Sequence, residues 1–235
     1  NFTSINPKSF RNVSFELRKG EILGVAGLDS SGRTELLENI FGSATRKSGK
    51  IYKNGKLVGN KTPREAIKNG FALVTEERRA TGILGILDIR ANTVIASLKK
   101  YLNGPFLSDK KMSEATEWGI KAMRTKTPSQ RTQIRSLSGG NQQKVILARE
   151  LEGSPDLLVA VHPTRGLDIG ATRFVHDTMI EARDKGCGVL LISADFDEIL
   201  EVSDRIVVMF EGQIMGVFSG KNPPIEEISL AMAGK

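Results

Sequence analysis

The stretch Leu137-Ser138-Gly139-Gly140-Asn141-Gln142-Gln143-Lys144 carries most of the information about fold and chemistry in this chain. Ser138 supplies a hydroxyl group, and Gly139 and Gly140 leave two backbone N–H groups without a side chain in the way. The run from Asn141 to Glu152 has the pattern of a helix, and a helix carries partial positive charge at its N-terminal end. Together these groups predict an anion site suited to a terminal phosphate. A helix cap with a Gly-Gly turn is the structural alternative for Ser-Gly-Gly alone.

A second glycine-rich loop lies near the start of the chain, and it makes that alternative improbable. The loop reads Gly27, Leu28, Asp29, Ser30, Ser31, Gly32, Arg33 and Thr34. It follows the apolar run Ile22 to Ala26, which predicts a buried strand, and it opens the helix predicted from Thr34 to Phe41. That is the context of a phosphate-binding P-loop, with the Thr34 hydroxyl placed as a weak Mg²⁺ ligand. Arg33 stands at the usual lysine, so the charge is kept but a planar fork replaces a point charge.

Composition limits the classes of protein that the chain can belong to. Of its 235 residues 39% are hydrophobic and 26% charged, which is ordinary for a globular protein. No apolar run approaches the ~18–20 residues of a membrane span. The basic residues behind the net charge of +7 are scattered in pairs such as Lys99-Lys100, so we expect a solvated surface and no nucleic-acid partner. A single cysteine, Cys187, excludes an internal disulfide, and we expect a cytosolic setting.

Apolar runs and helical patterns alternate along the chain. Strands are predicted at Val13 to Leu17, Ile22 to Ala26, Phe71 to Thr75, Leu157 to Val161, Val189 to Ser193, Arg205 to Phe210 and Gln213 to Phe218. An Asn-Gly turn predicts a hairpin at Lys50 to Lys56. Helices are predicted at Ala171 to Asp184 and Asp197 to Glu201, and a helical stretch broken at Asn103-Gly104-Pro105 runs from Asp88 to Lys126. This alternation predicts an α/β fold with a mostly parallel core sheet, antiparallel β elements and an inserted helical subdomain.

These motifs, in this order, resemble the nucleotide-binding domain of ABC transporters over nearly the whole chain. The resemblance implies the P-loop NTPase fold of ABC ATPases, with a core at 1–84 and 136–220, a helical subdomain at 85–135 and a C-terminal tail at 221–235. The run Gly32-Arg33-Thr34-Glu35-Leu36, the run Thr75 to Arg79 and the run Pro163 to Asp168 are similar to the C-terminal ATPase domain of two-domain bacterial sugar importers. Because the chain opens at Asn1 without a methionine, we expect a fragment of a longer two-domain polypeptide.

The resemblance also exposes departures from the family pattern. Val161 stands where an aspartate would hold Mg²⁺, and His162 where a glutamate would polarise the attacking water. Ala194 replaces the histidine that contacts the γ-phosphate, and Glu76 replaces a glutamine. For His162 a hydrogen bond to backbone is a better interpretation than a rescued catalytic base. No catalytic residue is therefore assigned.

The groups that the chain would lend to a partner domain are intact by the same comparison. They are the signature residues Leu137, Ser138, Gly139, Gly140, Asn141 and Gln142 and the loop residue Asp168. The altered residues all belong to the chain's own nucleotide site. The asymmetry predicts a donor half-site, whose own ATP site binds Mg²⁺ weakly and hydrolyses ATP slowly or not at all.

The resemblance implies partners and a location. It implies the N-terminal ABC domain of the same polypeptide, transmembrane permease subunits and, indirectly, a substrate-binding protein, at the cytoplasmic face of the bacterial inner membrane. The segments Phe71 to Asn92 and Met123 to Ile134 look closest to galactose/methyl-galactoside importers, or to the ribose type. The segments from Leu157 onward look more like nucleoside importers, so both substrate classes stay open.

Two other functions compete with that of an importer domain. A soluble ABC ATPase of DNA repair would carry long coiled coils between the P-loop and the signature, and no sustained heptads occur between Thr34 and Leu137. A regulatory module that binds nucleotide without hydrolysis differs from the importer only in its partner. Phe2 and Phe10 are candidates for stacking on adenine, at spacings that do not decide between them.

Overall fold

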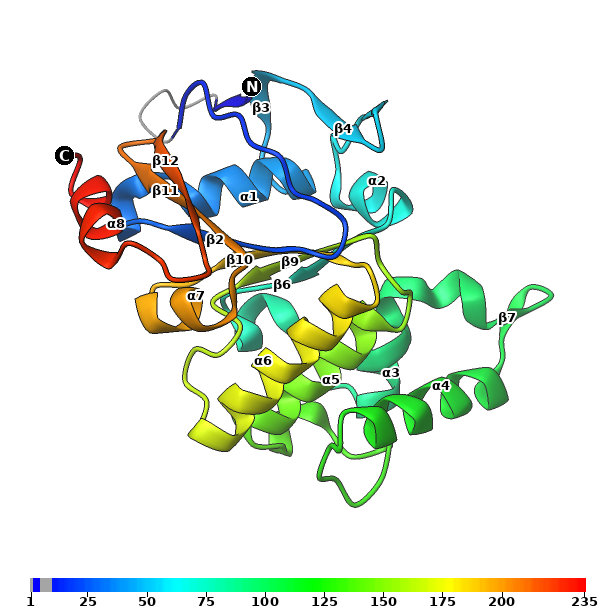
Figure 1. Ribbon diagram of the computed structural model, residues 1–235. Coiled ribbons are helices and arrows are strands. Elements are labelled where there is room, and N and C mark those ends of the chain that lie inside the picture. Colours follow the sequence, from blue (N-terminus) through cyan, green and yellow to red (C-terminus); the bar gives the residue numbers. More distant parts are fainter. Residues whose placement is uncertain (1, 5–9) are drawn as a thin grey trace. The chain divides into compact units, whose positions relative to one another are not determined.

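A six-stranded sheet organises the first part of the computed structural model, which describes residues 2–4 and 10–235 (Figure 1). The strand order is β12-β11-β2-β10-β9-β6. The strands of this sheet are β2 (Ile22–Ala26), β6 (Phe71–Val74), β9 (Leu157–Val161), β10 (Gly188–Ile192), β11 (Arg205–Phe210) and β12 (Gln213–Ser219). Strands β11, β2, β10 and β9 run parallel, and β12 is antiparallel to β11. The predicted mostly parallel sheet is confirmed.

The chain divides into two compact units. The first unit comprises residues 1–73, 156–162 and 179–235, and the second comprises residues 74–155 and 163–178. The first unit holds most of the sheet, with helices α1 (Arg33–Phe41), α2 (Pro63–Lys68), α7 (Phe196–Val202) and α8 (Ile225–Met232). It also holds the two-stranded sheets of β1 (Phe2–Ser4) with β3 (Arg46–Gly49) and of β4 (Ile51–Lys53) with β5 (Lys56–Val58).

Alternation along the strands places apolar side chains on both faces of the sheet. Val25 and Val207 belong to a buried cluster that includes α1 residues such as Leu36. Their neighbours Ala26 and Val208 belong to a second cluster that includes residues of α7 and α8. Figure 1 shows α1 and α7 on opposite faces of these strands. The predicted C-terminal tail therefore ends in a helix that packs against β11 and β12.

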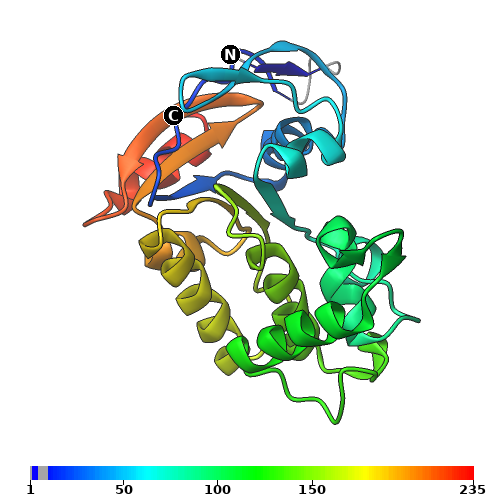
Figure 2. The ribbon, with the colours of Figure 1, turned by 90° about the vertical axis from the view of Figure 1, so that its right-hand side faces the viewer.

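The second unit is mainly helical. Its helices are α3 (Ile89–Val94), α4 (Asp109–Ala122), α5 (Gly139–Leu151) and the first part of α6 (Ile169–Asp184). Helices α3, α4 and α5 pack against one another pairwise, and Figure 2 shows them side by side. The break predicted at Asn103-Gly104-Pro105 is the hairpin between β7 (Leu102–Asn103) and β8 (Phe106–Leu107). A helix cap starts α3, where Asp88 accepts a hydrogen bond from the Ala91 N–H at 2.8 Å.

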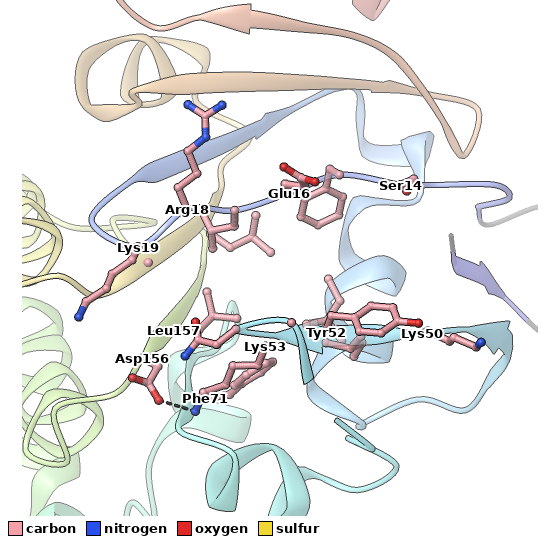
Figure 3. A pocket seen from close by; sticks show the side chains of 18 of the residues that line it. Ser14, Glu16, Arg18, Lys19, Lys50, Tyr52, Lys53, Phe71, Asp156 and Leu157 are labelled. Atoms are coloured by element: carbon pink, nitrogen blue, oxygen red, sulfur yellow. Dashed lines mark hydrogen bonds and ion pairs between the residues drawn. The ribbon is translucent and has the colours of Figure 1, made fainter. Parts of the chain in front are cut away.

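The prediction of a strand at Val13 to Leu17 is wrong. Apart from an isolated bridge at Val13, this segment has no regular pairing. A cavity of about 760 Å³ lies between it and β4, lined by Phe15 and Leu17 on one side and Ile51 and Tyr52 on the other. Figure 3 shows the segment with Ser14 and Arg18 on one side of this space and Tyr52 and Lys53 on the other. The alternation of apolar and polar residues indicates which side chains are buried. Backbone pairing, however, requires a partner strand that can be distant in sequence.

The predicted hairpin at Lys50 to Lys56 is confirmed. Strands β4 and β5 pair antiparallel around Asn54 and Gly55, whose φ angles are 50° and 74°. These are the left-handed conformations of a type I′ turn, which favours Asn-Gly. The turn between β11 and β12 has the same left-handed conformations at Glu211 and Gly212, with φ angles of 43° and 74°.

Candidate nucleotide site

The phosphate loop lies between the carboxyl end of β2 and the start of α1, where a P-loop is expected. Gly27 has a φ of 155° and Gly32 a φ of 86°. A Cβ on Gly27 would lie 2.5 Å from the Met209 carbonyl oxygen and 2.7 Å from Ser31 Oγ. The loop can therefore follow this path only with glycine at position 27.

Arg33 turns its charge into the protein. Its side chain is only 4% exposed, and its Nη1 donates to the Ser193 carbonyl oxygen at 2.7 Å. Its Nη2 lies 3.5 Å from the Asp29 carboxylate, whose side chain is 96% exposed. The cation that replaces the usual lysine is therefore committed to the segment after β10. A phosphate in the loop would have to compete for it.

The loop still offers groups that fit an anion. The first N–H groups of an α-helix have no partner within the helix, and α1 presents such groups from Arg33 onward. Ser31 Oγ is buried and has no hydrogen-bond partner among the described residues. Thr34 is half-buried in the first turn of α1. These donors fit phosphate oxygens better than they fit a metal ion.

The carboxyl end of β9 lacks the acidic groups that would complete a metal site. Val161 is buried in the same apolar cluster as Val159 and Ile192. Among the residues that the structure describes, no three His, Cys, Asp or Glu side chains gather where they could hold a metal ion. Of the residues at positions 34 and 161, Thr34 is therefore the one that could bind Mg²⁺ through its side chain. A single hydroxyl group fits a divalent cation poorly.

His162 joins the end of β9 to the segment after β10. Its N–H donates to the Ile192 carbonyl oxygen at 2.7 Å, and its Nδ1 accepts from the Ala194 N–H at 2.9 Å. Because Nδ1 accepts, the ring proton of a neutral imidazole lies on Nε2. The backbone at His162 is left-handed, with a φ of 44°. The imidazole ring thus forms a hydrogen bond with the backbone, as the interpretation from sequence expected.

The signature residues form the start of α5 in the second unit. Ser138 caps the helix, and its Oγ accepts from the Asn141 side chain at 2.9 Å. A Cβ on Gly140 would lie 2.9 Å from Ala171 Cβ, so a larger residue would push α5 and α6 apart. Gln142 is fully buried, and its Nε2 donates to the Leu137 carbonyl oxygen at 3.0 Å. These contacts restrict the conformations that the loop can adopt.

Asp168 lies beside the signature, a contact that the sequence did not indicate. Its Oδ1 accepts from the Ala171 N–H at 2.8 Å, which caps α6. Its Oδ2 is 4.0 Å from the point where a Cβ on Gly140 would lie. The two starts of α5 and α6 are therefore adjacent.

Glu76 is engaged by an arginine that sequence reasoning did not single out. Arg165 Nη1 lies 2.5 Å from Glu76 Oε1 and 3.4 Å from Glu77 Oε1. Arg165 falls in the run Pro163 to Asp168 and Glu76 in the run Thr75 to Arg79. Both runs are recognisable in the sequence, but nothing in their spacing indicates that they meet.

Of the two adenine-stacking candidates, the structure describes only the side chain of Phe10 and does not support it. Phe10 is fully buried in the cluster on the α1 face of the sheet, so its ring is unavailable to a base. The side chain of Phe2 lies outside the described residues. The altered positions 33, 161, 162 and 194 all belong to the first unit, and the signature, Asp168 and Glu76 belong to the second.

Of the helices that lie in residues 2–4 and 10–235, none combines the length and apolar character that a bilayer crossing demands.

Comparison with known proteins agrees with these features. The family model described as ABC transporter matches residues 10–165. A galactose/methyl galactoside import ATP-binding protein, MglA, of Fusobacterium nucleatum is 49% identical over 97% of this chain and 46% of its own length. One from Photobacterium profundum is 48% identical over 100% of this chain and 47% of its own length. The chain thus spans about half the length of the curated relatives it matches.

Solved structures share the fold. A twinned crystal structure of an ATP-binding cassette of an ABC transporter has a TM-score of 0.80 at 22% identity, covering 99% of this chain and 93% of its own. A nucleotide-free ATP-binding cassette from an ABC transporter has a TM-score of 0.76 at 24% identity, covering 96% and 89%. At these identities the likeness establishes the ATP-binding cassette fold alone. With the family match over more than half of its residues, the chain belongs to the ABC transporter family.

Proposed function

We propose that this chain is the ATP-binding, energy-coupling domain of a bacterial importer for a sugar of the galactose/methyl galactoside class. The names of the relatives support the substrate class. Their length, about twice that of this chain, supports a second ABC domain on the same polypeptide as its first partner. Permease subunits and a substrate-binding protein complete the proposed assembly, at the cytoplasmic face of the inner membrane.

Within that assembly the chain acts as the donor half of an ATP site. The observation that carries this proposal is the contrast between two sets of contacts. Arg33, the chain's own phosphate cation, is buried against the Ser193 carbonyl. The Ser138 loop and Asp168, by contrast, are held beside each other by caps and close packing. The sound ATP site would therefore combine this signature with the phosphate loop of the partner domain.

The chain's own site would hold ATP by its phosphates. The backbone of residues 27–34, with the Ser31 and Thr34 hydroxyl groups, would bind and orient the phosphate oxygens. When bound, Mg²⁺ neutralises charge that develops on the transferred phosphoryl group. With Val161 at the place of a metal-holding carboxylate, Thr34 would bind that ion weakly. Ala194 offers no side-chain donor, so hydrolysis at this site would be slow or absent.

The replacement Ser138→Arg tests the donor role. Measured in the full two-domain protein with its permease in proteoliposomes, it should lower sugar uptake and sugar-stimulated ATP hydrolysis by at least about 100-fold, as loss of a key transition-state contact can. The chain's own phosphate loop is unchanged in this variant. Uptake that survives Ser138→Arg would overturn the donor half-site.

A matched control separates this effect from the loss of a helix cap. Ser108 caps α4 as Ser138 caps α5, since its side chain accepts from the Lys111 N–H. The replacement Ser108→Arg removes an equivalent cap at a site away from the signature. It should lower the midpoint of thermal unfolding about as much and leave uptake within roughly twofold of wild type.

A further inference from the structure

Arg165 lies at the centre of a polar cluster in the second unit. Its guanidinium contacts the carboxylates of Glu76 and Glu77, at 2.5 and 3.4 Å. Its carbonyl oxygen accepts a hydrogen bond from Arg78 Nη1 at 3.1 Å. Glu76 and Arg78 follow β6, whereas Arg165 immediately precedes the loop from Gly166 to Asp168. One residue therefore binds the segment after β6 through both its side chain and its backbone.

Arg78 extends the cluster to the signature. Its Nη2 lies 3.0 Å from the point where a Cβ on Gly139 would stand, and 4.0 Å from the same point on Gly166. Its Nε is buried without a hydrogen-bond partner among the described residues. Desolvation by burial, with a smaller contribution from Arg79, lowers the pKa of Arg78. A half-buried cation is thus packed where the signature glycine and the loop at Gly166 come together.

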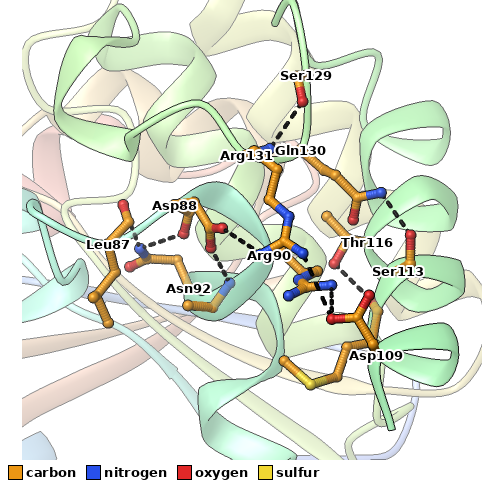
Figure 4. Close-up of polar contacts among 12 residues, drawn as sticks. Leu87, Asp88, Arg90, Asn92, Asp109, Ser113, Thr116, Ser129, Gln130 and Arg131 are labelled. Carbon is orange, nitrogen blue, oxygen red and sulfur yellow. Dashed lines mark hydrogen bonds and ion pairs between the residues drawn. The ribbon is translucent and has the colours of Figure 1, made fainter.

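Stability alone does not account for this arrangement. The side chain of Arg165 is 60% exposed, and ion pairs at such sites stabilise a fold very little. Arg131 offers a comparison within the same unit (Figure 4). Its side chain is 58% exposed and lies 3.6 Å from Asp88 and 3.5 Å from Asp109. Arg131 joins only the starts of α3 and α4, whereas Arg165 and Arg78 join the elements of the proposed donor site.

We propose that Arg78 and Arg165 are positioning residues that fasten the segment at Glu76, the loop Gly166–Asp168 and the signature loop into one unit. Through them the chain presents Ser138 and Asp168 to the partner's nucleotide in a fixed relation. The inference rests on the donor role proposed above. It also gives Glu76 a different role from the glutamine it replaces, because its carboxylate binds Arg165 and the pair links the loop after β6 to the donor loops.

The geometry of arginine is essential to this role. Arg78 donates from one guanidinium nitrogen to the Arg165 carbonyl, and its other terminal nitrogen lies 3.0 Å from the point where a Cβ on Gly139 would stand, a pair of positions that suits a rigid planar fork. Lysine keeps the charge but has one nitrogen, so Arg78→Lys can reach the Arg165 carbonyl or fill the space beside Gly139, but not both. Glycine at position 139 leaves the space that this fork occupies.

Charge exchange in the full two-domain protein with its permease tests the proposal. Arg165→Glu should speed hydrogen exchange of the backbone amides at 138–142 and 166–172 and lower kcat for ATP hydrolysis. Each change should be roughly 2- to 30-fold, the range that altered coupling between sites produces, with KM for ATP changed less than kcat. The double exchange Glu76→Arg with Arg165→Glu should recover much of both losses. Arg78→Lys should give an intermediate loss.

Arg131→Glu is the matched control, because it reverses an equally exposed arginine that also faces two carboxylates. It should leave kcat and the exchange rates of both loops unchanged. Arg165→Gln repeats the test with a neutral polar side chain, should the charge reversal impair folding. Unchanged loop exchange and kcat in Arg165→Gln, or a loss that follows the unfolding midpoint and resists the double exchange, would overturn the proposal.

The outcome can be told apart from a failure of the donor role. If Ser138→Arg abolishes hydrolysis while the Arg165 and Arg78 variants change neither loop exchange nor kcat, only the positioning role fails. If Ser138→Arg retains hydrolysis, the donor role itself fails, and loop exchange in the Arg165 variants still reports whether the two arginines fasten the loops.

Discussion

Single residues in this chain show how burial decides what a side chain can do. Arg33 carries the charge that a phosphate loop needs, yet its contact with the Ser193 carbonyl holds it inside the protein. Cys187 is buried beside Gly188, where its Sγ lies 3.3 Å from the carbonyl oxygen. Burial raises the pKa of the Cys187 thiol to about 11, with Asp156 adding a smaller increase. In both cases the surroundings keep the side chain from the role that its type often takes, anion binding for arginine and nucleophilic attack for cysteine.

The thiol of Cys187 should therefore react slowly with alkylating reagents, and its ionisation should lower the stability of the folded chain at alkaline pH. At pH 8 a pKa raised from 9.0 to about 11 lowers the thiolate fraction roughly 100-fold below that of a free cysteine, so iodoacetamide should label Cys187 about that much more slowly in the folded chain. As pH rises from about 9 to 11, the unfolded thiol ionises before the folded one, and the free energy of unfolding should fall by up to about 3 kcal/mol. Urea unfolding against pH measures this fall.

The variant Cys187→Ala is the control for that titration. It has no thiol to ionise, so its stability should decline less steeply over the same pH range than that of the wild type. Parallel declines in the two proteins would show that other groups cause the alkaline loss.

Packing between elements depends on glycines whose neighbours leave no room for a side chain. Gly24 lies in the middle of β2, under α7. A Cβ at this position would lie 2.3 Å from Ser203 Oγ and 2.8 Å from Ile199 Cγ2. Helix α7 can therefore pack this close to β2 only because residue 24 has no side chain. The hydrophobic pattern of either element does not indicate this requirement.

Gly24→Ala should destabilise the chain by roughly 1–3 kcal/mol, because α7 must shift to admit the methyl group. Gly85→Ala is the matched control, since the nearest atom to its Cβ position is Arg135 Cβ at 3.7 Å. That variant should stay within about 0.5 kcal/mol of wild type. Chemical unfolding of both variants measures the difference. Equal stabilities would mean that α7 moves without cost.

At the scale of the whole molecule, the groups of the two proposed half-sites are divided between the two units. The first unit holds the phosphate loop and the strand ends of the chain's own site, and the second holds the signature and Asp168. The departures from the family pattern thus gather in the first unit, apart from Glu76. This distribution is what a chain that lends one site and retains a weakened one would have.

Calorimetry of Mg-ATP with the isolated chain, run alongside steady-state hydrolysis, tests the retained site. We expect weak binding and hydrolysis at the background rate, because Val161 and Ala194 remove the metal and γ-phosphate contacts. Ordinary turnover that Arg33→Ala abolishes would contradict this, since Arg33 would then have to leave Ser193 and serve the phosphates directly.

Much of this protein could be predicted from its sequence. Strands β2 and β9 begin and end where the apolar runs do, because buried parallel strands need continuous apolar residues. The glycine-rich loop and the Ser138 cap could also be predicted, because each depends only on residues that are adjacent in the chain.

Only the tertiary structure decided the contacts between distant segments. Phe10 is buried in the core, and Arg33 donates a hydrogen bond to the Ser193 carbonyl. The segment from Val13 to Leu17 has no regular strand partner, and Glu76 forms an ion pair with Arg165. Each of these depends on which segments meet and on the free energy of burying or pairing a group there. Local sequence specifies the chemistry that a residue can offer, whereas packing determines whether that chemistry faces a ligand, a carbonyl or a carboxylate.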